Sequence, residues 1–179
     1  MELTYQRMTK KSDKAILDKV QNTFETCFPP EERPPFHMII GWKNASFFAV
    51  FRGEEYVGLV NTVEYHDLLY VFFLAIDAEH RKQGIGGTIL TDLKKKHDGK
   101  RLFLLVDELD PKYEDYDVRL ARYGFYQSNG FKPSGIFVLE FGVRYEMFVA
   151  SEKVSKEEFV AVMTHVIGKF RAWMFYRNV

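Results

Sequence analysis

The segment that decides the fold reads VFFLAIDAEHRKQGIGGT and spans residues 71–88. It begins inside an apolar run, residues 68–76, whose length and lack of charge predict a strand that is buried on both faces. A turn of four residues, 77–80, follows. A glycine-rich stretch then opens a segment whose apolar side chains recur at helical spacing as far as Lys96. The sequence therefore predicts a strand, a turn and a helix in this order.

The start of this helix is a candidate anion site. The first N–H groups of a helix have no partner within the helix, and the helix dipole favours a negative charge there. Gly84 and Gly86 carry no side chain that would hold a phosphate away from those amides, and Arg81 and Lys82 add positive charge. The residues alone leave a second interpretation open, in which the glycines only allow close packing.

Outward from this segment, the chain predicts a mixed α/β fold (α+β) with one domain over residues 1–179. The strand, helix and strand in the middle predict a right-handed crossover and one parallel strand pair, in a sheet that is otherwise mostly antiparallel and flanked by helices. The expected elements are strand 3–8, a helix capped by Ser12, strands 46–51, 55–65 and 68–76, helix 84–96, strand 101–106, helix 117–128, a hairpin of 135–141 and 144–150, and one extra C-terminal helix, 155–175, with a Ser155–Glu158 capping box.

Composition excludes several classes of protein. Lys plus Arg and Asp plus Glu both number 25, so no overall basic field exists to attract nucleic acid, and a phosphate-bearing ligand needs a local site. Cys27 is the only cysteine, which excludes an intrachain disulfide and a cysteine-rich zinc site, and the five histidines show no metal-ligand spacing. The longest apolar run is too short to cross a bilayer, and the charged start lacks a secretion signal, so a cytoplasmic protein without a membrane partner is expected.

Two segments resemble motifs of the GCN5-related N-acetyltransferase (GNAT) family, and they follow one another along the chain in the same order as in that family. The pattern Arg81-x-x-Gly84-x-Gly86 after a buried strand resembles the family's acyl-CoA-binding signature. The family's Phe-Tyr-x-x-x-Gly-Phe segment is matched by Phe125-Tyr126-Gln127-Ser128-Asn129-Gly130-Phe131. The resemblance covers roughly residues 46–150, includes the first helix only loosely and does not explain the C-terminal helix.

The resemblance implies acetyl-CoA (coenzyme A) as the cofactor. In this family the fourth and fifth strands part at their C-terminal ends, and the pantetheine arm lies along the exposed edge of the fourth strand. The pyrophosphate would bind the amides from Gln83 to Thr88. The cofactor-binding residues implied in this sequence are Leu74, Ala75, Ile76, Arg81, Lys82, Gln83, Gly84, Ile85, Gly86, Gly87, Thr88, Arg119 and Tyr126.

The activity implied is direct transfer of an acetyl group to a primary amine of a small molecule or peptide. Tyr126 occupies the family position of the acid that protonates the leaving thiolate, and its ordinary pKa of about 10 lies above that of a thiol, about 8.5. The helix alone would indicate an aromatic core residue at this position. Arg119 stands where the family often has Asn, and it could hold a cofactor phosphate or lie on a solvated helix face.

The general base is not identified by the resemblance. Glu64, near the end of the third strand (55–65), and Asp107 and Glu108, after the fifth strand, are candidates, although a solvated turn carboxylate is the simpler interpretation of each. Glu31 and Glu32 lie in the proline-rich connection that borders the acceptor site in this fold, where they could attract a cationic amine.

Two further hypotheses stay open at this point. One is a non-catalytic acyl-CoA sensor on the same fold, and the other is an unrelated phosphate-binding α/β domain. The C-terminal helix could pack on its own sheet, which is preferred, or form a homodimer. Its apolar stripe comprises Phe159, Val162, Met163, Val166, Ile167, Phe170, Trp173 and Met174.

Overall fold

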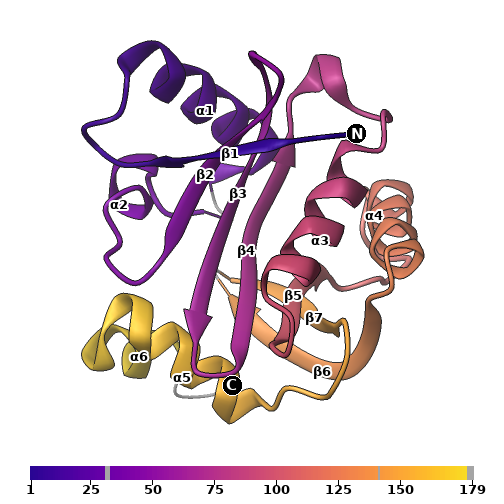
Figure 1. Ribbon diagram of the computed structural model, residues 1–179. Coiled ribbons are helices and arrows are strands. Elements are labelled where there is room, and N and C mark those ends of the chain that lie inside the picture. Colours follow the sequence, from indigo (N-terminus) through magenta and orange to yellow (C-terminus); the bar gives the residue numbers. More distant parts are fainter. Residues whose placement is uncertain (31–32, 141, 177–179) are drawn as a thin grey trace.

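The structure, a computed structural model, describes residues 1–30, 33–140 and 142–176. Glu31 and Glu32 lie outside the described residues, as do the side chains of Phe170, Trp173 and Met174. A seven-stranded sheet runs through the molecule, with helices on both of its faces (Figure 1).

The strands are β1 (Thr4–Met8), β2 (Ser46–Arg52), β3 (Glu55–Tyr65), β4 (Leu68–Ile76), β5 (Arg101–Asp107), β6 (Lys132–Glu140) and β7 (Val143–Val149). The helices are α1 (Lys14–Cys27), α2 (Phe36–Ile39), α3 (Ile85–Lys96), α4 (Tyr116–Ser128), α5 (Lys156–Ile167) and α6 (Lys169–Tyr176), and a short 3-10 helix covers Ala78–His80. The three predicted consecutive strands 46–51, 55–65 and 68–76, which form an antiparallel meander, and the predicted helices 84–96 and 117–128 are confirmed, with ends that differ by at most one residue.

The sheet has the strand order β1-β2-β3-β4-β5-β7-β6, and its neighbours are antiparallel except for the parallel pair β4 and β5. The parallel register joins Leu68–Val71 to Arg101–Leu104 and then stops. On the other edge of β4, Asn61 pairs with Phe73 and Thr62 with Val71, so Phe72 is an extra residue that forms a bulge. The mixed sheet with one splayed parallel pair is thereby confirmed.

Three groups of buried side chains join the helices to the sheet. On one face, Ile85, Ile89 and Leu90 of α3 pack with residues of β4 and β5. The opposite face is divided: α1 and α2 cover one part, and α5 and α6 cover the other (Figure 1). Because alternate side chains of a strand point to opposite faces, β4 contributes to all three groups.

Helix α1 starts one residue later than the sequence indicated. Its N-cap is Asp13, whose Oδ1 accepts a hydrogen bond of 3.2 Å from the amide of Ile16. The expected cap, Ser12, instead accepts a hydrogen bond from the amide of Thr9 at 2.9 Å. The two residues are neighbours and both are good caps, so the sequence did not decide between them.

The C-terminal segment contains two helices where one was predicted. Gly168 adopts φ 84° and its amide donates to the carbonyl of Thr164, which ends α5, and α6 begins at the next residue. A positive φ of this kind suits glycine and interrupts a helix. The predicted capping box of Ser155 and Glu158 is confirmed, and α5 buries Phe159, Val162 and Met163 against the chain's own sheet.

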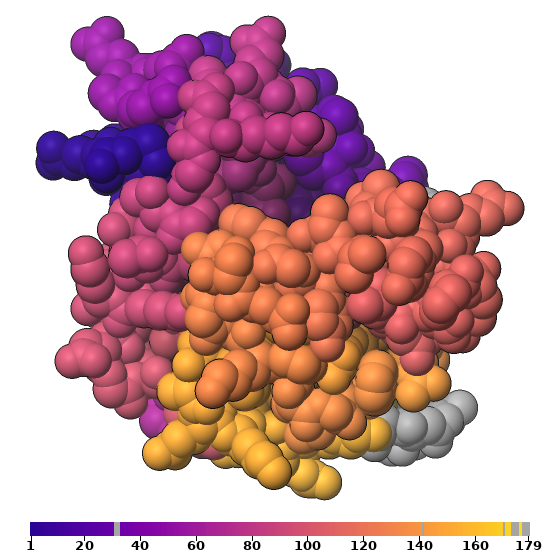
Figure 2. All heavy atoms as spheres, turned by 90° about the vertical axis from the view of Figure 1, so that its right-hand side faces the viewer, coloured from indigo at the N-terminus to yellow at the C-terminus, as the bar shows by residue number. Residues whose placement is uncertain are grey.

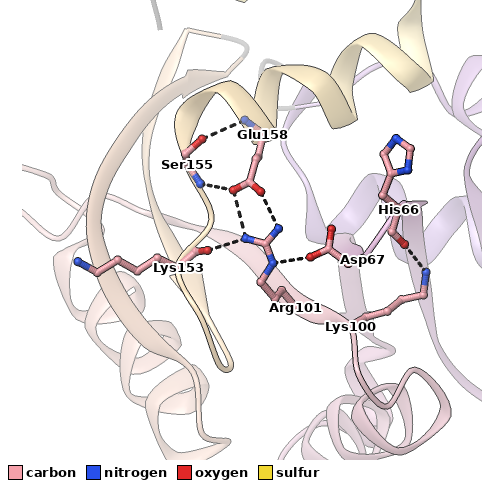
Figure 3. Close-up of polar contacts among 7 residues, drawn as sticks. All are labelled: His66, Asp67, Lys100, Arg101, Lys153, Ser155 and Glu158. Atoms are coloured by element: carbon pink, nitrogen blue, oxygen red, sulfur yellow. Dashed lines mark hydrogen bonds and ion pairs between the residues drawn. The ribbon is translucent and has the colours of Figure 1, made fainter.

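Arg101, at the start of β5, anchors this segment (Figure 3). Its guanidinium donates to Asp67 at 2.7 Å, to the carbonyl of Lys153 at 2.8 Å and to both carboxylate oxygens of Glu158 at 2.6 and 3.2 Å. The same Glu158 accepts from the amide of Ser155 in the capping box. The paired strands β4 and β5 are thus tied to the first turn of α5.

Candidate functional site

A cavity of about 460 Å³ opens where β4 and β5 part. In Figure 2 the surface is hollowed between the magenta segment that leads into α3 and the orange α4. Its lining belongs to both faces of the sheet, since Phe125 and Tyr126 pack on the α3 side and Tyr70 and Phe72 pack on the α5 side. The cavity therefore reaches through the sheet, and two molecules could meet in it from opposite faces.

The edge of β4 that borders the cavity has peptide groups without a strand partner. The amide of Asp77 donates to Val57 of β3, and alternate residues of a strand direct their peptide groups to opposite sides. Leu74 and Ile76 therefore direct theirs toward the cavity. Ala75, which was expected to contribute in the same way, turns its carbonyl oxygen toward β3 and reaches the cavity with its side chain.

The start of α3 offers a second set of donors. The first hydrogen bond of the helix runs from the amide of Thr88 to the carbonyl of Gly84, so the amides of residues 85–87 precede it and have no acceptor within α3. Gly84 has φ 77°, and the place of its missing Cβ is open space. Gln83 is held in place, because its side chain accepts from Arg52 at 2.9 Å and donates to the carbonyl of Glu79 at 3.1 Å.

Gly86 and Gly87 have a packing role. A Cβ at Gly86 would lie 2.9 Å from Cζ of Phe125, and one at Gly87 would lie 2.7 Å from Oδ1 of Asn129. Both contacts are with α4 or its C-cap. The interpretation that the glycines permit close packing therefore holds for Gly86 and Gly87. This packing does not use the amides of residues 85–87, which stay available to a ligand.

Arg81 joins three elements at the mouth of the cavity. Its Nε donates to the carbonyl of Ile76 at 3.2 Å, and its Nη2 lies 3.2 Å from Sγ of Cys27 at the end of α1. Lys82 follows in a left-handed conformation with φ 60° and an exposed side chain. The neutral chain therefore places two positive charges next to the open amides of α3.

Tyr126 lines the cavity from α4 and is half-buried. Burial raises the pKa of its phenol to about 12; the charge of Arg122 lowers this pKa and that of Asp107 raises it by smaller amounts. The rings of Phe125, Phe131 and Phe148 pack around it. The hydroxyl therefore stays protonated at neutral pH and can donate a proton or hydrogen bond into the cavity.

Arg122 and Asp107 form an ion pair in the cavity wall. Asp107 is buried, and the guanidinium of Arg122 balances its charge, so this expected base is already neutralised by a partner.

Arg119 does not line the cavity. Its Nε donates to Asp115 at 2.7 Å, its Nη1 donates to the carbonyl of Glu108 at 3.2 Å, and its guanidinium stacks 3.9 Å from the ring centre of Tyr113. The side chain is buried by these contacts. Arg119 thus holds the loop before α4 in place and does not lie on a solvated helix face, and its contact with a cofactor phosphate stays a prediction.

The other two expected carboxylates lie outside the cavity lining. Glu64 is on β3 opposite Leu69, at the far end of the meander, and its carboxylate lies 3.3 Å from Lys100 and 3.7 Å from His97. Glu108 accepts a hydrogen bond from the hydroxyl of Tyr113 at 3.2 Å and lies within ion-pair distance of Lys112 and Arg144. Neither carboxylate is brought together with Tyr126.

Among the cavity residues that the sequence did not indicate is an acidic one, Glu140 at the end of β6. It is only 4% exposed, and its two oxygens accept hydrogen bonds from the hydroxyls of Tyr70 at 3.3 Å and Tyr176 at 2.7 Å. Burial raises the pKa of its carboxyl to about 7. Strand alternation places Glu140 on the same face as the buried Val138, and this was the signal that could have found it.

The described part of the chain has neither a metal-binding cluster nor a membrane-spanning helix. No group of three or more His, Cys, Asp or Glu side chains in it could hold a metal ion. None of its helices is both long enough and apolar enough to cross a membrane. The expected cytoplasmic location and the homodimer stay predictions.

The sequence matches a family model described as an acetyltransferase (GNAT) domain over residues 43–133, slightly more than half of the chain. The match includes β4, the start of α3 and Tyr126. No curated protein sequence gives a significant match.

Solved structures share the fold. A protein from Bacteroides thetaiotaomicron that is assigned to the GNAT acetyltransferases superposes with a TM-score of 0.74 at 19% identity, covering 93% of this chain and 99% of its own. An aminoglycoside 6'-N-acetyltransferase in complex with coenzyme A gives 0.60 at 16% identity, with 87% and 100% covered. A Bacillus subtilis acetyltransferase in complex with CoA gives 0.54 at 10% identity, with 85% and 100% covered. At such identities the likeness concerns the fold alone.

Proposed function

Because this chain belongs to the GNAT family of acetyltransferases, we propose that it transfers an acetyl group from acetyl-CoA directly to a primary amine of a small molecule or peptide. The observation that carries the proposal is the cavity between β4 and β5, which borders the start of α3 and contains Tyr126. Three features that acetyl transfer needs converge there: donors for a diphosphate, an open strand edge and a protonated acid.

The residues fit coenzyme A on physical grounds. The amides of residues 85–87 have no acceptor within α3, and Gly84 leaves open space in front of them, which suits an anion at a helix N-terminus. Arg81 and Lys82 add positive charge for the phosphates. The peptide groups of Leu74 and the amide of Ile76 can pair with a pantetheine arm in the manner of an added strand, while the carbonyl of Ile76 accepts from Arg81. When bound, acetyl-CoA supplies an acetyl group activated as a thioester.

The chain's own groups then act on the reacting atoms. An amide of β4 that points into the cavity, such as that of Leu74, can donate to the carbonyl oxygen and stabilise the charge that develops on it. The hydroxyl of Tyr126, whose pKa of about 12 keeps it protonated, can donate its proton to a departing sulfur. The aromatic rings of the cavity exclude water from these groups.

Replacing Tyr126 by Phe tests the catalytic role. General acid catalysis contributes about 10²- to 10⁴-fold, so kcat should fall by a factor in this range while the affinity for coenzyme A stays within about twofold. Tyr123→Phe is the matched control, because Tyr123 lies on the same helix with its ring against Phe148 and does not line the cavity.

The assay is thiol release from acetyl-CoA with a panel of amines, alongside calorimetry with coenzyme A. Equal kcat values for the wild-type protein and Tyr126→Phe would contradict the role of Tyr126. Tight coenzyme A binding without turnover in either protein would instead favour the alternative of a non-catalytic acyl-CoA sensor.

A further inference from the structure

The cavity contains two buried carboxylates with different partners. Asp107 is balanced by Arg122. Glu140 accepts from two tyrosine hydroxyls, but no lysine, arginine or histidine in the described parts of the chain lies within ion-pair distance of it. Hydroxyl donors stabilise a buried carboxylate without cancelling its charge, and an unbalanced buried charge is costly. Glu140 is therefore a site where a cationic ligand would supply the missing charge.

The carboxylate can accept further hydrogen bonds. Each oxygen of an ionised carboxylate offers about two acceptor positions, and the hydroxyls of Tyr70 and Tyr176 use one on each oxygen. Two positions therefore remain when only donors from the described residues are considered, and Glu140 is one of the residues that line the cavity. An ammonium group, which has three N–H donors, matches this arrangement.

The walls beside Glu140 are aromatic. Tyr70, Phe72 and Tyr145 line the cavity and pack with the buried group on the α5 side of the sheet. Tyr126 lines it from the α3 side. An acceptor that enters from the α5 side would therefore place its cation at Glu140 and its body between aromatic rings, which favour flat apolar groups and cations over their faces.

We propose that Glu140 binds the protonated amine of the acceptor and accepts the first proton that this amine loses. The acceptor is a monoamine attached to an apolar, aromatic body. This inference rests on the proposed acetyl transfer and assigns its acceptor side. The cavity residues offer no unbalanced carboxylate to a second cation on the acceptor, because the other cavity carboxylate, Asp107, already forms an ion pair with Arg122.

The proton balance is as follows. The ammonium nitrogen loses its first proton to Glu140, and its lone pair then forms the C–N bond to the acetyl carbon. As the C–S bond breaks, Tyr126 gives its proton to the sulfur, and the second proton of the nitrogen restores the phenol. The proton held by Glu140 passes to solvent, so one proton is released for each amide and thiol formed.

The test uses the wild-type protein, Glu140→Gln and the control Glu64→Gln, whose ion pairs with Lys100 and His97 lie outside the cavity. Binding of 2-phenylethylamine to each protein saturated with coenzyme A is measured by calorimetry, with 2-phenylethanol as the uncharged analogue and spermidine as the polycation. Acetyl transfer to the same amines is measured by thiol release. Coenzyme A affinity and circular dichroism report whether each variant is folded.

The expected result is that Glu140→Gln binds 2-phenylethylamine about 30-fold or more weakly than the wild-type protein, while 2-phenylethanol binding and coenzyme A affinity change less than about threefold. Transfer to 2-phenylethylamine should exceed transfer to spermidine in kcat/KM and should fall at least about 100-fold in Glu140→Gln. Glu64→Gln should behave as the wild-type protein.

A pH series on the wild-type protein needs no substitution. The ionisable groups that face Glu140 are Tyr70 from β4, Tyr145 from β7 and Tyr176 from α6, and Asp107 and Arg122 line the same cavity. Burial raises the pKa of Tyr70 and of Tyr176 far above neutrality. Amine affinity should therefore fall about tenfold from about pH 8 to about pH 6, as Glu140 gains a proton.

Three outcomes would overturn the inference while coenzyme A still binds. They are an amine affinity that Glu140→Gln leaves within about threefold, an amine affinity in the wild-type protein that is flat over this pH range, and a preference for spermidine over 2-phenylethylamine. Failure of the wild-type protein to bind coenzyme A would overturn the proposed function itself.

Discussion

At the scale of single residues, the buried carboxylate of Glu140 has a consequence for stability that is independent of any ligand. Burial raises its pKa from about 4.5 to about 7, so the folded chain holds this proton more tightly than the unfolded chain does. The contribution to stability is fully present below about pH 4.5 and is lost as the pH rises toward about 7.

The stability of the wild-type protein should therefore fall as the pH rises from about 4.5 to about 7, and Glu140→Gln should abolish this fall. The difference in unfolding free energy between the wild-type protein and the variant should change by about 3 kcal/mol, in favour of the variant, between about pH 4.5 and pH 8. Urea denaturation at a series of pH values measures it. Parallel pH curves for the two proteins would contradict the burial of an ionisable group at this position.

The residues of the site were partly predictable. Gly84, Gly86 and Tyr126 were identified because sequence patterns mark helix starts and the family's segments. The actual partners of Arg119 were not foreseen. Asp115 lies four residues earlier, a spacing that could have indicated the pair, whereas the folded loop before α4 brings the carbonyl of Glu108 to Arg119. Glu140 was missed because Tyr176, its stronger donor, is 36 residues away in the sequence.

At the scale of elements, the contact between α3 and α4 depends on the missing side chain of Gly86. A methyl group there would meet the ring of Phe125 at 2.9 Å, whereas Gly124, in α4, has open space around the position of a Cβ.

Gly86→Ala should destabilise the protein by about 1–3 kcal/mol, because Phe125 must move. Gly124→Ala should stabilise the protein by up to about 1 kcal/mol, because alanine favours a helix and its methyl group would lie in open space. Chemical denaturation of both variants measures the difference. Changes of the same sign would show that the two helices do not approach as described.

The anchor of α5 gives a second prediction at this scale. Arg101→Ala removes the bonds to Asp67, Glu158 and the carbonyl of Lys153, which should cost about 2 kcal/mol and increase amide exchange in α5 and α6 before the meander is affected (Figure 3). Lys14→Ala, which breaks an exposed ion pair with Asp18, is the control and should change stability by less than about 1 kcal/mol. Uniform exchange over the whole sheet in Arg101→Ala would argue against a local anchor.

Element types were predictable to the extent that they depend on local periodicity. The aromatic and β-branched residues of β2 and β3 and the apolar run of β4 are properties of short segments. The break at Gly168 was not foreseen, because the apolar stripe continues past it, and the bulge at Phe72 depends on the register with β3.

At the scale of the whole molecule, the separation of β4 from β5 leaves an opening in an otherwise continuous sheet. The register stops after Val71 and Leu104, and the cavity that follows borders helices on both faces. In the proposed reaction, the acetyl donor and the amine acceptor would approach from opposite faces and meet beside Tyr126. The crossover predicted the parallel pair, but the depth of the opening depends on side chains from α1, α4, β6 and β7 that only the folded chain assembles.

The proposed function requires above all that main-chain amides at the start of α3 and along β4 bind coenzyme A. A Gly86 variant is a poor test, because its side chain would also displace Phe125. Titration of the ¹⁵N-labelled wild-type protein with coenzyme A, followed by amide chemical shifts, needs no substitution. We predict saturable changes that are largest at residues 83–88 and at Leu74 and Ile76. Saturation that leaves these amides unmoved, or no binding at millimolar coenzyme A, would contradict the account.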